Sequence, residues 1–183
     1  MTEIKTYTLI DGRITCGQYP FSSDKAKGVK KLMSILDLGV THFIDLTEVH
    51  EQSTNSELLE RYESYLKEIR SQTQIQYTNI AIPDERLKWK IDRFLNVRKL
   101  VLKNLKEAKH TYVHCRGGYY RTSLLACLVL VEFNEKDAQV VLSELYKTFE
   151  KAKFTLPPGY NDIGTEIKPY VVTAINQLRN LRT

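Results

Sequence analysis

The feature that most constrains the fold of this chain is a short apolar strand that leads through a glycine-containing loop into an almost wholly apolar helix. Residues 111–113 (TYV) have the composition of a buried strand, and residues 124–131 are nearly continuously apolar. A helix without a polar face belongs in the middle of a domain, where neighbours cover it on all sides. This order of elements predicts an α/β fold, with the connecting loop at the carboxyl end of a strand.

The rest of the chain alternates in the same way between strand-like and helix-like segments. Alternating or continuous apolar runs predict strands, and apolar residues at helical spacing predict helices. We expect a largely parallel central sheet flanked by helices, in one domain that spans residues 1–183. The expected strands are 7–10, 13–16, 42–46, 75–82 and 111–113, and the expected helices are 23–38, 58–69, 90–108, 124–131, 135–149 and 167–181, with a loop over 153–164.

Composition limits the cellular compartment. No stretch reaches the roughly 20 apolar residues of a membrane-spanning helix. The first residues lack a basic segment followed by an apolar run. The three cysteines, Cys16, Cys115 and Cys127, lack the paired spacing of a disulfide framework or a zinc site. We therefore expect a soluble, cytoplasmic protein with reduced thiols, and we assign no role to Cys16 or Cys127.

Charge is unevenly distributed along the chain. Residues 1–85 carry 9 Lys and Arg against 13 Asp and Glu, a net charge of −4, whereas residues 86–183 carry 18 against 9, a net charge of +9. A basic half attracts anions such as phosphate esters, and equally nucleic acid or a membrane surface. The alternative interpretation is a solvated, lysine-rich helix face over residues 90–108.

The loop after the strand at 111–113 carries a sequence pattern that indicates a reactive site, HCRGGYYRT over residues 114–122. The backbone amides of this loop would converge on one anion at a helix N-terminus. Its two consecutive glycines allow close approach of the backbone. Six residues beyond Cys115, the planar fork of Arg121 would hold two phosphate oxygens at once. The pattern predicts a phosphate-binding loop.

The same loop predicts a reactive thiol. The helix dipole, the amides and Arg121 all favour the thiolate form of Cys115. A leaving oxygen needs a proton from an acid on a movable loop, and Asp84, directly after an expected strand, is the best candidate. The alternatives are a buried, inert cysteine and a turn-forming Pro-Asp pair. His114 is expected to orient the loop by hydrogen bonds, and the Thr122 hydroxyl to lie within reach of the sulfur.

These residues resemble the signature loop of the protein tyrosine phosphatase superfamily, His-Cys-x-x-Gly-x-x-Arg-Ser/Thr. The chain is most similar to the compact dual-specificity-like branch. Segment 80–84 (IAIPD) is similar to the strand and acid loop of that branch, with the acid 31 positions before the cysteine. Segments 13–20 and 43–47 are similar to its N-terminal portion. The resemblance covers residues 10–178.

The resemblance implies a cysteine phosphatase-like fold and a two-step reaction that needs no metal or cofactor. Cys115 would form a cysteinyl phosphate, and Asp84 would first protonate the leaving oxygen and then activate water. The catalytic set would be Cys115, Arg121, Asp84 and Thr122, supported by His114, and the phosphate would be held by Arg116, Gly117, Gly118, Tyr119, Tyr120 and Arg121.

The chain departs from the family pattern at several positions. Tyr120 and Ser123 stand where many relatives have a small residue or glycine, and Lys88 stands where proline is frequent. Residues 165–167 (TEI) occupy a region that often supplies a water-positioning glutamine. Arg116 adds a cation to the loop, where lipid-directed relatives tend to carry lysines, and this permits, without indicating, a second anionic group on the substrate.

Phosphotyrosine in a protein is the leading expectation for the substrate, with phosphoserine and phosphothreonine left open. One alternative is a phosphate-binding pseudophosphatase or scaffold with little turnover. Phosphatases of phosphoinositides or of RNA 5′-phosphates are further alternatives, since the basic half permits them. A sulfur transferase with a cysteine loop is also open, although such an enzyme would not need Asp84.

Overall fold

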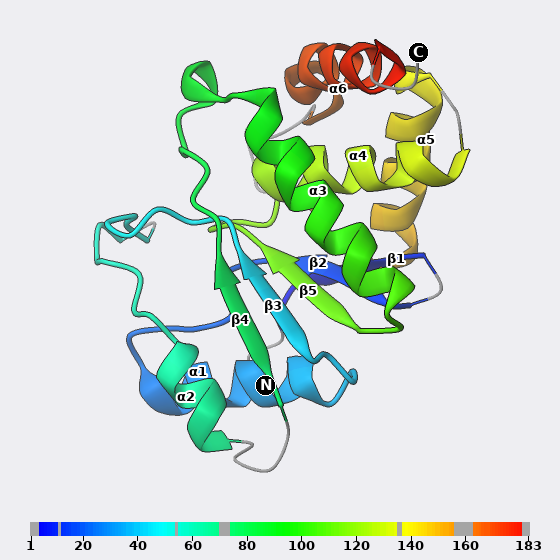
Figure 1. Ribbon diagram of the computed structural model, residues 1–183. Helices are drawn as coiled ribbons and strands as arrows, with labels where there is room; N and C mark the ends of the chain where they lie inside the picture. The colour runs from blue at the N-terminus through cyan, green and yellow to red at the C-terminus, as the bar shows by residue number, and fades with distance from the viewer. Residues whose placement is uncertain are drawn as a thin grey trace.

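A five-stranded sheet organises the chain in a computed structural model that describes residues 4–10, 12–53, 55–69, 74–134, 137–155 and 163–180 (Figure 1). The strand order is β1-β2-β5-β3-β4, and only the β1–β2 pair is antiparallel. The predicted largely parallel sheet is thus confirmed. The strands are β1 (Thr6–Leu9), β2 (Ile14–Gly17), β3 (His42–Asp45), β4 (Gln76–Asn79) and β5 (Thr111–His114).

Helices cover the sheet on both sides, as Figure 1 shows. Helices α1 and α2 lie below the sheet in that view, and α3 to α6 lie above it. The helices are α1 (Lys25–Leu36), α2 (Glu63–Ile69), α3 (Ile91–Lys106), α4 (Tyr120–Asn134), α5 (Ala138–Lys151) and α6 (Ile163–Asn180), with a 3₁₀ turn, η1, at Arg86–Lys88. The predicted α/β architecture is therefore confirmed.

Alternate residues of the central strands enter two separate cores. Phe43 of β3 and Tyr112 of β5 belong to the cluster under α1 and α2. Their neighbours Ile44 and Val113 belong to the larger cluster under α3 to α6. Successive side chains of a strand point to opposite faces, so both faces of β3 and β5 are buried, as in a parallel sheet covered by helices. This burial fixes the register of β5 and the starting point of the loop after it.

Helix α4 fills the middle of the larger core. It packs against α3, α5 and α6, and residues 124–129 are at most 2% exposed. The prediction of a buried helix directly after the glycine loop is confirmed. Because α4 begins at Tyr120, its first turn lies at the carboxyl end of β5 and in the middle of the sheet.

The predicted helix over residues 58–69 was wrong in its first part. Helix α2 begins only at Glu63. The segment before it pairs instead with the loop after β3: Ser53 N–H donates to the Glu57 carbonyl and Leu59 N–H to the Glu51 carbonyl. These bonds hold the segment as an irregular hairpin. Its backbone groups pair with a neighbouring loop segment four to eight residues away, which a pattern of helical composition does not show.

The other boundaries shift by smaller amounts. The predicted strand 75–82 ends at Asn79, although Ile80 and Ile82 still donate backbone bonds to Asp45 and Leu46. Helix α6 begins at Ile163, four residues before its predicted start, and most of the predicted loop over 153–164 lies outside the described residues.

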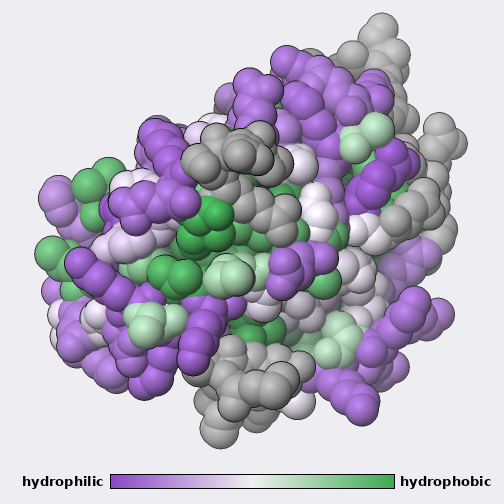
Figure 2. Space-filling view, turned by 90° about the horizontal axis from the view of Figure 1, so that it is seen from below, coloured by the Kyte–Doolittle hydropathy of each residue, from purple (hydrophilic) through white to green (hydrophobic). Residues whose placement is uncertain are grey.

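The view from below shows mainly hydrophilic side chains around the edge, with hydrophobic ones gathered near the middle (Figure 2). Within the described ranges, no helix is both long and apolar enough to cross a membrane.

Candidate active site

The loop from Cys115 to Tyr119 joins the buried end of β5 to the first turn of α4. Its backbone is held from the side, since Tyr19 N–H donates to the Arg116 carbonyl at 3.0 Å. The Gly118 N–H donates to the Cys115 sulfur at 3.3 Å. The sulfur therefore lies inside the turn, facing the backbone amides, and Cys115 is only 3% exposed.

Two glycines permit the loop to lie close to the end of β2. Gly118 has a φ of +78°, and a Cβ there would lie 2.6 Å from the carbonyl carbon of Gly17. A Cβ on Gly17 would in turn lie 2.6 Å from the Tyr112 hydroxyl and 2.8 Å from the Lys5 carbonyl oxygen. Only residues without a side chain fit this approach, so Gly118 is required both by conformation and by space.

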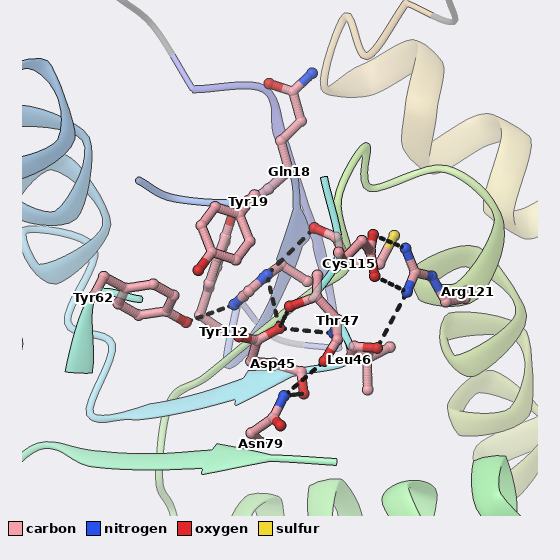
Figure 3. Close-up of polar contacts among 12 residues, drawn as sticks. Gln18, Tyr19, Asp45, Leu46, Thr47, Tyr62, Asn79, Tyr112, Cys115 and Arg121 are labelled. Atoms are coloured by element: carbon pink, nitrogen blue, oxygen red, sulfur yellow. Dashed lines mark hydrogen bonds and ion pairs between the residues drawn. The ribbon is translucent and has the colours of Figure 1, made fainter. Parts of the chain in front are cut away.

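Arg121 is buried under the loop and carries a set of partners that the sequence did not predict. Its Nη1 donates to Glu51 Oε2 at 2.7 Å, and its Nη2 donates to Glu51 Oε1 at 2.5 Å. Nη1 also donates to the carbonyls of Leu46 and Ile82. Burial alone would lower the pKa of Arg121, but the hydrogen bonds to Glu51 and the negative charges of Glu51 and Asp84 raise it. The guanidinium is thus a fixed cation beside the loop (Figure 3).

Asp84 reaches the same cation from the end of the β4 segment. Its Oδ1 accepts from Arg121 Nη2 at 2.9 Å, and its Oδ2 pairs with Arg116 Nη2 at 2.8 Å. Its backbone N–H donates to Glu48 Oε2 at 3.2 Å. The side chain is 42% exposed, so it lies at the mouth of the site. The structure therefore brings together the predicted thiol, arginine and carboxylate.

The segment after Asp84 is anchored to α6. Arg86 pairs with Glu166 at 3.1 Å, and the Tyr170 hydroxyl donates to the Arg86 carbonyl at 3.1 Å. Trp89 Nε1 donates back to the Pro83 carbonyl at 2.8 Å. Glu166, in the region where relatives often place a water-positioning group, is thus engaged by Arg86.

His114 is fully buried, and each of its two ring nitrogens has a hydrogen-bond partner. Nε2 lies 2.5 Å from the Tyr62 hydroxyl, and Nδ1 lies 3.3 Å from the Cys115 carbonyl oxygen. Burial lowers the pKa of His114. A neutral ring with its proton on Nδ1 satisfies both contacts, since Nε2 then accepts from the tyrosine. These two contacts fix the ring, and through the Cys115 carbonyl the ring orients the backbone of the loop.

Asp45 forms a second polar centre beneath the site (Figure 3). Its Oδ1 accepts from the Thr47 amide at 2.8 Å and from the Thr47 hydroxyl at 2.6 Å. Its Oδ2 accepts from Arg61 at 2.9 Å and from the Tyr77 hydroxyl at 2.8 Å. A fully buried carboxylate with this many donors holds the turn after β3, and hence the start of the segment that carries Glu51.

The predicted site residues in and after the loop, Tyr119, Tyr120 and Thr122, and the neighbouring Ser123 have different environments. Thr122 Oγ1 is buried and has no hydrogen-bond partner within the described part of the chain, the sulfur included. The Tyr120 ring lies 4.4 Å below the Arg86 guanidinium, and Ser123 is buried 3.5 Å from the Tyr7 hydroxyl. Tyr119 is buried, and its hydroxyl is 3.5 Å from Gln18 Nε2.

Sequence reasoning missed Glu51 and Asp45. Asp45 ends a strand that was predicted correctly, and a carboxylate at the carboxyl end of a parallel strand is a usable signal. Glu51 gave no such signal, because it lies in a polar loop among other acidic residues and its partner is 70 positions away.

A pocket of about 430 Å³ opens over the loop. Cys115, Arg116 and Arg121 line it, and aromatic side chains form much of its wall. The lining includes Gln18, Tyr19, Phe21, Lys31, Ser53, Leu59, Asp84, Gly117, Tyr119 and Tyr120.

The structure thus brings an arginine and an acidic side chain beside a cysteine in a strand-to-helix loop of a largely parallel sheet. The family model for the Swiss Army Knife protein DSP-PTPase phosphatase domain (PTP-SAK) matches residues 6–157. The chain therefore belongs to this family of dual-specificity-type phosphatase domains.

Known proteins agree with this assignment. The chain is 25% identical over 140 residues to "Putative tyrosine phosphatase 197R" of Invertebrate iridescent virus 6, covering 75% of this chain and 46% of that protein. It thus spans about half the length of this curated relative.

Two solved structures share the fold. TpbA of P. aeruginosa has a TM-score of 0.66 and 17% identity, over 97% of this chain and 90% of that one. The human tyrosine phosphatase-like serine/threonine/tyrosine-interacting protein has a TM-score of 0.62 and 14% identity, over 97% of each chain.

We predict that Glu51→Gln destabilises the protein by roughly 2–4 kcal/mol, because it removes the buried charged partner of Arg121 and leaves only the half-exposed Asp84. Glu57→Gln, in the same loop but exposed, should change stability by less than about 0.5 kcal/mol. Equilibrium unfolding in urea measures both. Equal stability of the two variants would contradict a structural role for the Glu51–Arg121 pair.

A second prediction concerns Gly118. Gly12→Ala serves as the control, since Gly12 has a similar φ of +74° but nothing within 4 Å of its Cβ position. The control should cost about 1–2 kcal/mol for the left-handed conformation alone. Gly118→Ala should cost clearly more, because backbone atoms occupy the space of its Cβ, and it should weaken binding of vanadate. Similar losses of stability and unchanged vanadate affinity would refute the close-packing argument.

Proposed function

We propose that this chain hydrolyses phosphate monoesters through a cysteinyl phosphate on Cys115, with phosphotyrosine in proteins as its substrate. The observation that carries the proposal is the contact of Asp84 with Arg121 at 2.9 Å, across 37 positions of sequence and beside the Cys115 loop. An anion-binding cation, a nucleophile and a proton donor at one pocket are the parts that this reaction requires.

In the first step, the Cys115 thiolate attacks phosphorus, a P–S bond forms, and the P–O bond to the leaving group breaks. The leaving oxygen takes the proton of the Asp84 carboxyl group. Arg121 and the loop amides hold the other phosphate oxygens, whose charge the fixed guanidinium and helix N-terminus offset.

In the second step, water attacks phosphorus and the P–S bond breaks. Asp84, now ionised, accepts a proton from the water, and the thiolate returns with inorganic phosphate as the product. The Thr122 hydroxyl is buried without a partner in the described structure, and we assign it the role of donating to the departing sulfur. His114 takes no part in proton transfer in this scheme and fixes the loop carbonyl.

Aromatic walls favour an aryl phosphate over a small polar one. Tyr19, Phe21 and Tyr119 line the pocket and provide flat surfaces for a tyrosine ring. A similar structure, P. aeruginosa TpbA, has been solved in complex with pTyr. Phosphoserine and phosphothreonine have shorter side chains and would bury less apolar surface against these walls. We therefore expect them to be poorer substrates than phosphotyrosine.

Phosphoinositides are the second candidate substrate. The similar structure PTPMT1 has been solved in complex with PI(5)P. Arg116 at the pocket mouth would suit an additional phosphate, but its guanidinium is paired with Asp84 and also donates to the Gln52 carbonyl. The aromatic walls offer few hydrogen-bond partners for the hydroxyl groups of inositol. We therefore favour phosphotyrosine over a phosphoinositide as the substrate.

We expect Cys115→Ser to lower turnover of p-nitrophenyl phosphate by about a thousandfold or more, because a neutral hydroxyl is a far weaker nucleophile than a thiolate. Binding of a phosphotyrosine peptide should persist, measured by calorimetry. Full activity of the variant would reject Cys115 as nucleophile. Binding without any turnover by the unmodified protein would favour a pseudophosphatase or scaffold.

We expect Asp84→Asn to slow phenyl phosphate by about 10²–10³-fold and p-nitrophenyl phosphate much less, because only the poorer leaving group depends strongly on protonation. The ratio of the two kcat values within each enzyme cancels general effects on folding. The same ratio in the variant and the unmodified protein would remove Asp84 from the role of acid.

A further inference from the structure

The pocket extends well beyond the loop that would hold phosphate. Its lining also includes Tyr19, Phe21 and Leu59, together with Lys31 of α1. The same pocket therefore holds the positive charge of the phosphate loop and the ammonium group of Lys31. Aromatic and aliphatic side chains form much of the remaining lining.

The Phe21 ring packs closely against α1 at Gly28, and this contact fixes its position in the pocket wall. A Cβ on Gly28 would lie 2.6 Å from the Phe21 ring, so the ring lies directly on the helix backbone at that point. On another side the ring stacks on Tyr65, with 4.5 Å between centroids. Lys31, one turn after Gly28, therefore lies next to a fixed aromatic surface.

Lys31 is an unusual lysine among those of α1. It is partly buried, and its pKa is lowered by that burial and by repulsion from Lys27. Lys27 itself pairs with Asp24 at 3.1 Å, whereas the Lys31 ammonium has no ion pair or hydrogen bond within the part of the chain that the structure describes. Lys30, the next residue back, is exposed.

The neighbouring acidic groups are already engaged. Glu57 and Glu60 line the groove that adjoins the pocket. Glu57 accepts from the Ser23 hydroxyl at 3.1 Å, and Glu60 accepts from the Tyr65 hydroxyl at 2.9 Å. The partly desolvated cation at Lys31 is therefore left for a group that enters from outside.

We propose that Lys31 forms a second anion subsite, which binds an acidic side chain close to the phosphotyrosine of a protein substrate. This inference rests on the proposed phosphatase function and adds a preference for sequence. The apolar wall that Tyr19, Phe21 and Leu59 contribute to the same pocket suits an aryl ring and a short stretch of peptide. A polyhydroxylated ring would leave its hydroxyl groups without partners along that wall, so a peptide is favoured over an inositol phosphate.

The test compares phosphotyrosine peptides that differ only in Glu against Gln, scanned over the three positions on each side of the phosphotyrosine. The unmodified protein should prefer the Glu peptide at one or two positions by about three- to tenfold in kcat/KM, as expected for a partly buried charge pair. Lys31→Met should reduce that ratio to about one. Lys30→Met, on the same helix, should leave it unchanged.

Reversing the charge of Lys31 tests the proposal more stringently. Lys31→Glu should reverse the preference, so that a Lys peptide is bound better than a Glu peptide at the same position. Preference ratios that stay the same in Lys31→Met and Lys31→Glu would overturn the proposal. A loss of activity on PI(5)P vesicles with unchanged peptide ratios would also overturn it, in favour of a lipid headgroup.

Failure of the underlying function gives a different result. The same peptide ratios are measured as dissociation constants in the Cys115→Ser background, which needs no turnover. If the unmodified protein does not hydrolyse p-nitrophenyl phosphate but the Glu preference persists in binding and depends on Lys31, the phosphatase function fails and the subsite stands. If phosphopeptides do not bind at all, the subsite fails as well.

Discussion

The buried ion pair between Arg121 and Glu51 is the interaction on which the rest of the site depends. Removing both charges from water is expensive, and only well-placed hydrogen bonds recover that cost. Here the pair is bidentate, and the carbonyls of Leu46 and Ile82 occupy further donors of the guanidinium. One side chain on α4 thereby ties together the segments that follow β3 and β4. The cation that would bind phosphate is also the centre that assembles its surroundings.

The partners of Arg121 differ in how easily they can leave. Glu51 is 4% exposed in its side chain, and the two carbonyls belong to backbone that continues the sheet. Asp84 is 42% exposed and lies at the pocket mouth. An incoming anion can therefore replace Asp84 on Nη2 without disturbing the rest, and the displaced carboxyl group stays at the mouth, where the leaving oxygen would emerge. The pairing of Asp84 with Arg116 holds it near that position.

Sequence alone predicted the parts of this fold that depend on local pattern. The strand, glycine loop and apolar helix around Cys115 were recognised because period, burial and turn chemistry all agree there. Glu51 was not recognised, because this residue of surface type is buried by a partner 70 positions away in the sequence. The misplaced start of α2 has a different cause: residues 58–62 look helical in composition, but Leu58 and Leu59 pair through the backbone with the neighbouring loop at 51–52.

The two residues in the first turn of α4 that depart from the family pattern have distinct structural partners. Ser123 packs against Tyr7 of β1, and Tyr120 carries the Arg86 guanidinium on its ring. Arg86 in turn pairs with Glu166 of α6 and belongs to the segment that follows Asp84. Tyr120 thus connects the phosphate loop to the acid segment. Cation–π contacts and exposed ion pairs of this kind are each worth only about 0–1 kcal/mol. Contacts of this size favour the position of the Asp84 segment beside the loop without locking it there.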